Sequence, residues 1–128
     1  MIIYYNAKCS KCRDALTLLE GAGCEVELRN YIAEPPSEQE LSNLIAKLGC
    51  KAEDIIRKDE LPYKEFGAKA KTEKARIKLM CKYPSIIQRP IVIDGNTAVI
   101  GRPPELVLSL VNVVKKKKSP SKKRTSQQ

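Results

Sequence analysis

The first thirty residues follow a strand, helix, strand order, and this order limits the possible folds more than any other feature of the chain. Residues 2–5 are apolar and β-prone, and in residues 25–30 Val26 and Leu28 alternate with charged side chains, which is typical of strands. Between these segments, four side chains recur at the spacing of one helix face: Cys12, Ala15, Leu16 and Leu19. The sequence therefore predicts a βαβ unit with a right-handed crossover.

The middle of the chain, residues 37–84, is predicted to be a helical insert. Ser37 and Glu40 form a capping box, and Gly49 indicates the end of the helix that follows. This helix carries four apolar side chains at helical spacing: Leu41, Leu44, Ile45 and Leu48. Two shorter helices are expected at about 52–57 and 73–82.

The last part of the chain returns to strands. Residues 91–93 and 97–100 are β-prone and flank Asp94-Gly95-Asn96, a typical hairpin turn. A final helix opens at Pro103-Pro104-Glu105 and carries Leu106, Leu110 and Val113, with proline in its first turn. The order βαβ, helical insert, ββα is that of a thioredoxin-like fold. We therefore predict one α/β domain over residues 1–114, with the insert at about 37–84.

Residues 115–128 hold seven of the 24 basic residues and no acidic one. The net charge of +9 therefore comes mainly from this segment, and the rest of the chain is close to neutral. Because the segment has no apolar side chain to bury, we expect a disordered, solvated tail. A weak contact with nucleic acid or another polyanion is the alternative, which the absence of interleaved aromatic residues disfavours.

The chain has five cysteines and no histidine. The lack of histidine excludes a Ser-His-Asp triad, a Cys-His nucleophile pair and a His-ligated metal. No apolar run approaches the ~18–20 residues of a membrane span, and residues 1–5 do not resemble a signal peptide. We therefore expect a cytoplasmic protein, in which an odd number of cysteines argues against a disulfide framework.

Cys9-Ser10-Lys11-Cys12 is a C-x-x-C motif between the first predicted strand and the first predicted helix. The first turn of a helix has free N–H groups and about half a positive charge, and Lys8, Lys11 and Arg13 add further positive charge. A cysteine there is stabilised as the thiolate, which is the reactive form. We therefore expect Cys9 to be a nucleophile, and a C-x-x-C beside a βαβ unit is typical of a redox pair.

The other cysteines favour simpler interpretations. Cys24, Cys50 and Cys81 lie on or near apolar faces, where free cysteine behaves as a small apolar residue. A zinc site would need a second ligand pair, so we expect no metal. Cys12 lies on the apolar stripe of its helix, so it is either a core residue or the resolving thiol for Cys9.

Three arginines, Arg57, Arg89 and Arg102, stand apart from the lysine-rich surface. Arginine presents a planar fork of donors that suits oxyanions, although each of them could also be a surface or ion-paired residue. In a thioredoxin-like fold the residue that opens the third strand is a cis-proline that faces the cysteines. Pro90 would take that place, which would put Arg89 beside Cys9.

Four stretches carry a family resemblance that extends from Ile2 to about Val114. They are residues 3–9 (IYYNAKC), 57–63 (RKDELPY), 84–92 (PSIIQRPIV) and 101–105 (GRPPE). The sequence resembles the arsenate reductase family of the glutaredoxin-coupled type, which also includes the Spx-type redox regulators.

The resemblance implies a mechanism for this chain. Cys9 would attack arsenate and form a covalent adduct. Arg57, Arg89 and Arg102 would hold the oxyanion, together with N–H groups of the Asn6–Cys9 loop, which includes Lys8, and of the helix start. In the family, glutathione then releases arsenite and glutaredoxin regenerates the enzyme. We expect no bound cofactor and a monomer.

Two departures from the family pattern keep alternatives open. Tyr5 stands where the reductases usually carry a histidine that favours the thiolate. Tyrosine cannot supply that positive charge, so Lys8 and the helix start would have to provide more of the stabilisation of the Cys9 thiolate. The well-known reductases also lack Cys12; a Cys9–Cys12 disulfide would replace the glutathione step, with thioredoxin as the donor. An Spx-like redox-sensing regulator that binds RNA polymerase, or a general thiol–disulfide oxidoreductase, would use the same pair. Gly101-Arg102-Pro103, not expected in Spx-type proteins, favours the enzyme.

Overall fold

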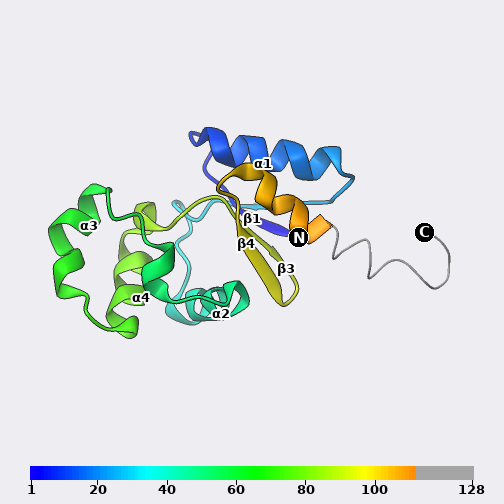
Figure 1. Cartoon of the computed structure of the whole chain (residues 1–128). Coiled ribbons are helices and arrows are strands. Elements are labelled where there is room, and N and C mark those ends of the chain that lie inside the picture. The colour runs from blue at the N-terminus through cyan, green and yellow to red at the C-terminus, as the bar shows by residue number, and fades with distance from the viewer. Residues whose placement is uncertain (112–128) are drawn as a thin grey trace.

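Four strands form one mixed sheet in the computed structural model, which describes residues 1–111 (Figure 1). The strands are β1 (Ile2–Tyr4), β2 (Glu27–Arg29), β3 (Ile91–Asp94) and β4 (Thr97–Ile100), in the order β2-β1-β3-β4. β1 is parallel to β2, and β3 is antiparallel to both β1 and β4. The predicted βαβ unit and the predicted hairpin are therefore confirmed. The predicted tail, 115–128, lies outside the described residues.

Alternate residues of the strands bury two separate cores on the two faces of the sheet. Ile3 and Val92 pack with α1 (Ser10–Gly21) and with η4 (Pro104–Val107). Residues 108–111 continue η4 as an α-helix. The rest of the expected final helix lies outside the described residues. Tyr4 and Ile91 face the other core, which includes α2 (Glu38–Leu48). Figure 1 shows α1 and η4 on one side of the sheet and α2 on the other.

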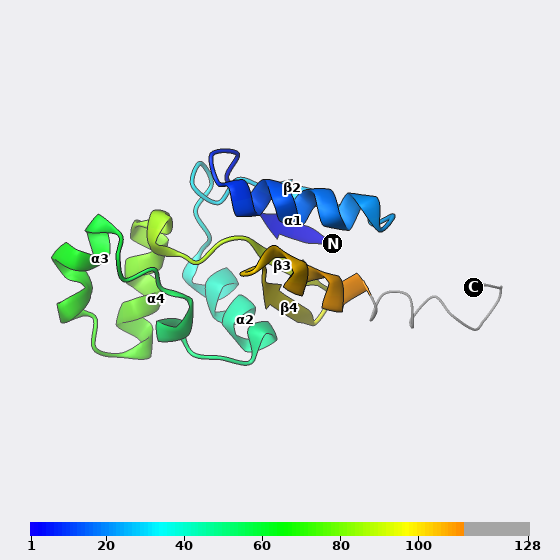
Figure 2. The same cartoon turned by 45° about the horizontal axis from the view of Figure 1, so that its top comes forward.

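The insert contains α2, η1 (Ala52–Ile55), α3 (Leu61–Phe66), η2 (Gly67–Lys69), α4 (Glu73–Lys82) and η3 (Pro84–Ile86). The capping box at Ser37 and the end of α2 at Gly49, which has φ 70°, are confirmed, as is the predicted helix over 73–82. Figure 2 shows α3 and α4 extending to one side of the sheet.

The predicted helix over 52–57 is wrong in its last two residues. A short 3-10 helix ends at Ile55, and Ile56 is extended because it pairs with Ile87 in an antiparallel bridge. Arg57 therefore does not end a helix. Helix α3 was not predicted, since it is six residues long and buries none of them. Among residues 1–111, no helix is long and apolar enough to cross a membrane.

Candidate functional site

Cys9 lies at the junction between the loop after β1 and the start of α1. It is the N-cap residue, with φ −96° and ψ 117°, and its carbonyl accepts a hydrogen bond from the Arg13 N–H at 3.2 Å. Cys9 is half-buried, whereas Cys12, in the first turn of α1, is completely buried. The helix thus presents Cys9 to the solvent and keeps Cys12 behind it, so Cys12 is a core residue that also contacts Cys9.

The surroundings of the two thiols separate their acidities. Partial burial alone would raise the pKa of Cys9, but the N–H and thiol of Cys12, and then the Arg89 guanidinium, outweigh it and lower the pKa. The Cys12 N–H makes no capping hydrogen bond of standard geometry, yet its dipole still stabilises the thiolate. Burial and the neighbouring Cys9 raise the pKa of Cys12 to about 12. Cys9 is therefore the more acidic thiol of the pair, and Cys12 keeps its proton at neutral pH.

Arg89 is the cation that faces Cys9. The Arg89–Pro90 peptide bond is cis and comes directly before β3, so the prediction of a cis-proline at the start of the third strand is confirmed. Arg89 Nη1 donates to the Ser85 carbonyl at 3.4 Å. Its Nε is buried and has no hydrogen-bond partner among residues 1–111. This buried donor is therefore left without a partner from the described part of the chain.

The other two arginines contact the backbone around Arg89 from different elements. Arg102 Nε donates to the Arg89 carbonyl at 2.7 Å, which fixes the start of η4 against the start of β3. The Arg57 N–H donates to the Ile86 carbonyl at 2.6 Å, so Arg57 lies beside the segment that leads to Arg89. Arg57 Nη1 is also buried and unpartnered within residues 1–111, while its Nη2 is 3.8 Å from Glu60.

The loop that carries Asn6 and Lys8 is held by its own hydrogen bonds. Asn6 Oδ1 accepts from the Lys8 N–H at 3.0 Å, and the Asn6 carbonyl accepts from the Cys9 N–H at 2.9 Å. Both amides therefore have hydrogen-bond partners within the loop itself, and the role of Asn6 and Lys8 toward an oxyanion stays a prediction. The Lys8 side chain is exposed, and it is Cys12 and Arg89, rather than Lys8, that lower the pKa of Cys9 against the effect of burial.

The structure adds one residue that the sequence did not single out. Tyr31 follows β2 just as the cysteine loop follows β1, and the carboxyl ends of adjacent parallel strands meet at the same edge of a sheet. Its hydroxyl faces Arg89 and the two cysteines. In the sequence, only the expected parallel pairing of β1 with β2 could have indicated that residues after β2 lie near the cysteines. That pairing does not distinguish Tyr31 from the residues next to it in the chain.

The remaining cysteines lie away from this cluster. Cys50 and Cys81 pack against the core that contains Tyr4, and Cys24 packs against the other core. All three are partly buried, which agrees with their interpretation as small apolar residues. Within residues 1–111, no group of three or more Cys, Asp or Glu side chains could hold a metal ion.

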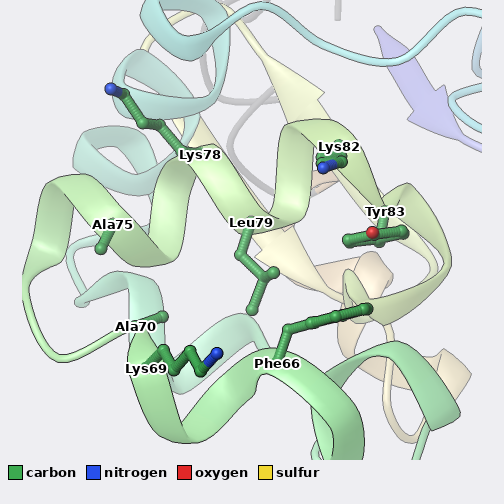
Figure 3. A pocket seen from close by; sticks show the side chains of 8 residues that line it. All are labelled: Phe66, Lys69, Ala70, Ala75, Lys78, Leu79, Lys82 and Tyr83. Carbon is green, nitrogen blue, oxygen red and sulfur yellow. The ribbon is translucent and has the colours of Figure 1, made fainter.

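A separate cavity of about 340 Å³ lies in the insert, between α4 and the segment of α3 and η2 (Figure 3). Phe66 and Tyr83 stack at one end, with ring centroids 5.3 Å apart, and Lys69, Lys78 and Lys82 contribute to the lining. All of its lining residues fall within 66–83. It therefore shares no residue with the cysteine site.

Comparison with known proteins places this geometry in context. The sequence model of the ArsC family matches residues 4–110. An uncharacterized protein in the glnII region of Streptomyces viridochromogenes is 42% identical over 84% of this chain and 95% of its own length. An arsenate reductase of Haemophilus influenzae is 38% identical over 87% of this chain and 98% of its own length.

A solved structure agrees with these sequence matches. The structure of an arsenate reductase from Vibrio cholerae superimposes with a TM-score of 0.81 at 38% identity. It covers 84% of this chain and 94% of the other. The predicted α/β fold of thioredoxin-like type is therefore confirmed, as is the resemblance on which the arginine assignments rest.

Proposed function

Because this chain belongs to the ArsC family and is an oxidoreductase, we propose that it reduces arsenate to arsenite at Cys9. The observation that carries the proposal is the pairing of a thiolate-favouring cysteine with Arg89. A second and a third arginine approach from the insert and from the start of η4. These contacts support a site in which the nucleophile and the anion-binding groups lie at one edge of the sheet.

The first step joins sulfur to arsenic. The Cys9 thiolate attacks As(V), a sulfur–arsenic bond forms, and one arsenate hydroxyl takes a proton and leaves as water. Unpartnered buried donors on Arg57 and Arg89 favour an oxyanion, because guanidinium groups form strong charge-assisted hydrogen bonds with it. The same donors stabilise charge that develops on the arsenate oxygens during attack.

The second step needs another thiol. That thiol attacks the Cys9 sulfur, the sulfur–arsenic bond breaks, and its electron pair remains on arsenic, which leaves as As(III) in arsenite. The two sulfurs are oxidised to a disulfide, and the proton of the attacking thiol passes to an arsenite oxygen. Cys12 contacts Cys9 and supports an internal Cys9–Cys12 disulfide that thioredoxin would reduce; glutathione with glutaredoxin is the other donor we consider. Either donor operates in a reducing cytoplasm.

The contact between Cys9 and Cys12 also favours a second candidate function. A general thiol–disulfide oxidoreductase, or an Spx-like redox-sensing regulator, would use the same pair without arsenate. The buried, unpartnered arginine donors support the reductase instead, because disulfide exchange has no use for an oxyanion site.

Arsenate-dependent oxidation of a thiol donor tests the proposal. The purified full-length protein is supplied with arsenate and with either reduced thioredoxin or glutathione plus glutaredoxin, and donor consumption is followed. We expect turnover with at least one donor and none in Cys9→Ser, whereas Cys24→Ser, a matched control on a partly buried cysteine elsewhere, retains it. Absence of turnover with both donors would exclude arsenate reduction.

Cys12→Ser then identifies the donor. Glutathione-coupled activity survives this change if glutathione attacks Cys9 directly, whereas a thioredoxin-coupled cycle that needs the Cys9–Cys12 disulfide does not.

Arg89→Ala separates the two candidate functions, since it should weaken arsenate use more than simple disulfide exchange. Equal losses in both reactions would favour the general oxidoreductase.

A further inference from the structure

Tyr31 carries a buried hydroxyl that packing alone does not explain. The side chain is completely buried, and its ring stacks on Tyr4 with centroids 5.7 Å apart and an interplanar angle of 13°. Among residues 1–111, the hydroxyl has no hydrogen-bond partner of standard geometry. A buried polar group without a partner costs folding free energy, and a phenylalanine ring would fill the same space without that cost. The hydroxyl therefore calls for a functional explanation.

The groups that face this hydroxyl are those of the cysteine site. Burial raises the pKa of Tyr31 to about 12, the Arg89 guanidinium opposes that rise, and the thiols of Cys12 and Cys9 add to it. Burial would lower the pKa of Arg89, but Tyr31 and Cys9 raise it. Arg89 thus interacts with the phenol and with the Cys9 sulfur at the same time.

We propose that Tyr31 is a positioning residue of the cysteine site, whose hydroxyl accepts a hydrogen bond from Arg89 and holds that charge against the Cys9 thiolate. At neutral pH the phenol keeps its proton, so its own O–H can donate to an oxygen of a bound oxyanion. The first role concerns Cys9 alone. The second rests on the proposed function.

The Tyr31→Phe variant tests the first role, because it keeps the stacked ring and removes only the hydroxyl. The readout is the rate of Cys9 alkylation by iodoacetamide as a function of pH, which reports the thiolate fraction. The groups that lower the Cys9 pKa, Cys12 from α1 and Arg89 from before β3, are unchanged in this variant. We expect the profile to move to higher pH and the rate at pH 7 to fall about 3- to 10-fold, as for the loss of one hydrogen bond.

Tyr4→Phe is the matched control. Tyr4 is the other ring of the same buried stack, and its hydroxyl donates to Glu40 at 3.1 Å, so the variant also removes one phenol oxygen. We expect its alkylation profile to coincide with that of the wild type. A folded Tyr31→Phe protein with an unshifted profile would overturn the proposal, as would an equal shift in both variants.

A second measurement avoids any loss of packing. With 3-fluorotyrosine placed at position 31, the fluorine resonance should follow the ionisation of Cys9 and lose that dependence in Cys9→Ser. A fluorine resonance that does not change when Cys9 ionises would contradict the proposal.

The KM for arsenate in Tyr31→Phe tests the second role, donation of a hydrogen bond to a bound oxyanion, and should rise. If the wild type does not turn over arsenate, the proposed function fails while the alkylation profiles still decide the role of Tyr31.

Discussion

Cys9 and Cys12 are three residues apart in one helical turn, yet their environments move their acidities in opposite directions. Cys9 is at the end of the helix, where an N–H dipole, a thiol donor and the Arg89 guanidinium lower its pKa against partial burial. Cys12 is completely enclosed, and burial together with the neighbouring sulfur raises its pKa to about 12. A chain without histidine can therefore still lower the pKa of one cysteine thiol and raise that of its neighbour.

This difference predicts selective chemical modification. With limiting iodoacetamide at pH 7, Cys9 should be alkylated ahead of the other four cysteines. The thiolate is the reactive form, and the pKa of Cys9 is lowered while burial raises those of Cys12, Cys50 and Cys81. Cys12 should remain unmodified until the protein unfolds. Peptide mapping by mass spectrometry measures the order. Alkylation of Cys12 at a rate similar to Cys9 in the folded protein would contradict the assigned roles.

At the residue scale, a site residue could be predicted when the elements that position it are its neighbours in the sequence, and not when they are far away in the chain. Cys9 could be predicted because its motif adjoins the strand and helix that position it. Arg89 could be predicted through Pro90, once the fold was assigned. Arg57 could not be placed, because its position depends on a bridge between Ile56 and Ile87, whose partners are far apart in the chain. Tyr31 had no local pattern at all.

At the scale of elements, the end of β4 approaches the start of β3 so closely that only glycine fits. The Gly101 N–H donates to the Pro90 carbonyl at 2.8 Å. A Cβ added at Gly101 would lie 2.9 Å from Pro90 Cγ and 2.9 Å from Val107 Cγ1. The Gly-Arg-Pro motif of the sequence thus has a packing role beside its arginine.

Gly101→Ala should therefore both destabilise the protein and disturb the site. Overpacking of this kind costs about 1–3 kcal/mol, and a shift of Pro90 would move the adjacent Arg89 away from Cys9. Urea denaturation and arsenate turnover measure the two effects. Gly21→Ala is the control, since nothing lies within 4 Å of its added Cβ, and it should leave both quantities nearly unchanged. Wild-type stability in Gly101→Ala would show that the contact relaxes without cost.

Helices were predicted wrongly in two situations: where pairing with a distant segment prevailed over the local helical pattern, and where a helix buries no apolar residue. The helical pattern over 52–57 continued into Ile56, but strand-like pairing with Ile87 prevailed there. Helix α3 has no buried residue, so it leaves no apolar stripe to detect. The long elements with clear stripes and caps, α1 and α2, could be predicted.

At the scale of the whole molecule, one polar network fastens the insert to the sheet. Glu40, the third helical residue of α2 and the partner of Ser37 in its capping box, accepts a hydrogen bond from Tyr4 of β1 at 3.1 Å and pairs with Arg29 of β2 at 2.6 Å. The Arg29 guanidinium also lies over the Tyr4 ring, 5.8 Å from its centroid. This network therefore connects the start of the insert to β1 and β2.

The network should make stability depend on acid pH through Glu40. Burial alone would raise the pKa of Glu40, but Arg29 and Tyr4 outweigh it and lower the pKa. A carboxyl with a lowered folded-state pKa stabilises the protein above its unfolded-state pKa, and that contribution is lost as the pH falls through the folded-state pKa. Glu40→Gln should therefore cost about 1 kcal/mol at pH 7, a modest value because the Glu40 side chain is 37% exposed and solvent screens the pair.

Urea denaturation of both proteins from pH 7 to about pH 3 checks the expectation. The difference in free energy of unfolding between wild type and Glu40→Gln should shrink toward the acid end, where Glu40 in the wild type becomes protonated. Glu53→Gln is the control: its pair with Lys58 is exposed on both sides, so no measurable change is expected. A difference for Glu40→Gln that stays constant with pH would mean that packing of the side chain, rather than its charge, holds the insert in place.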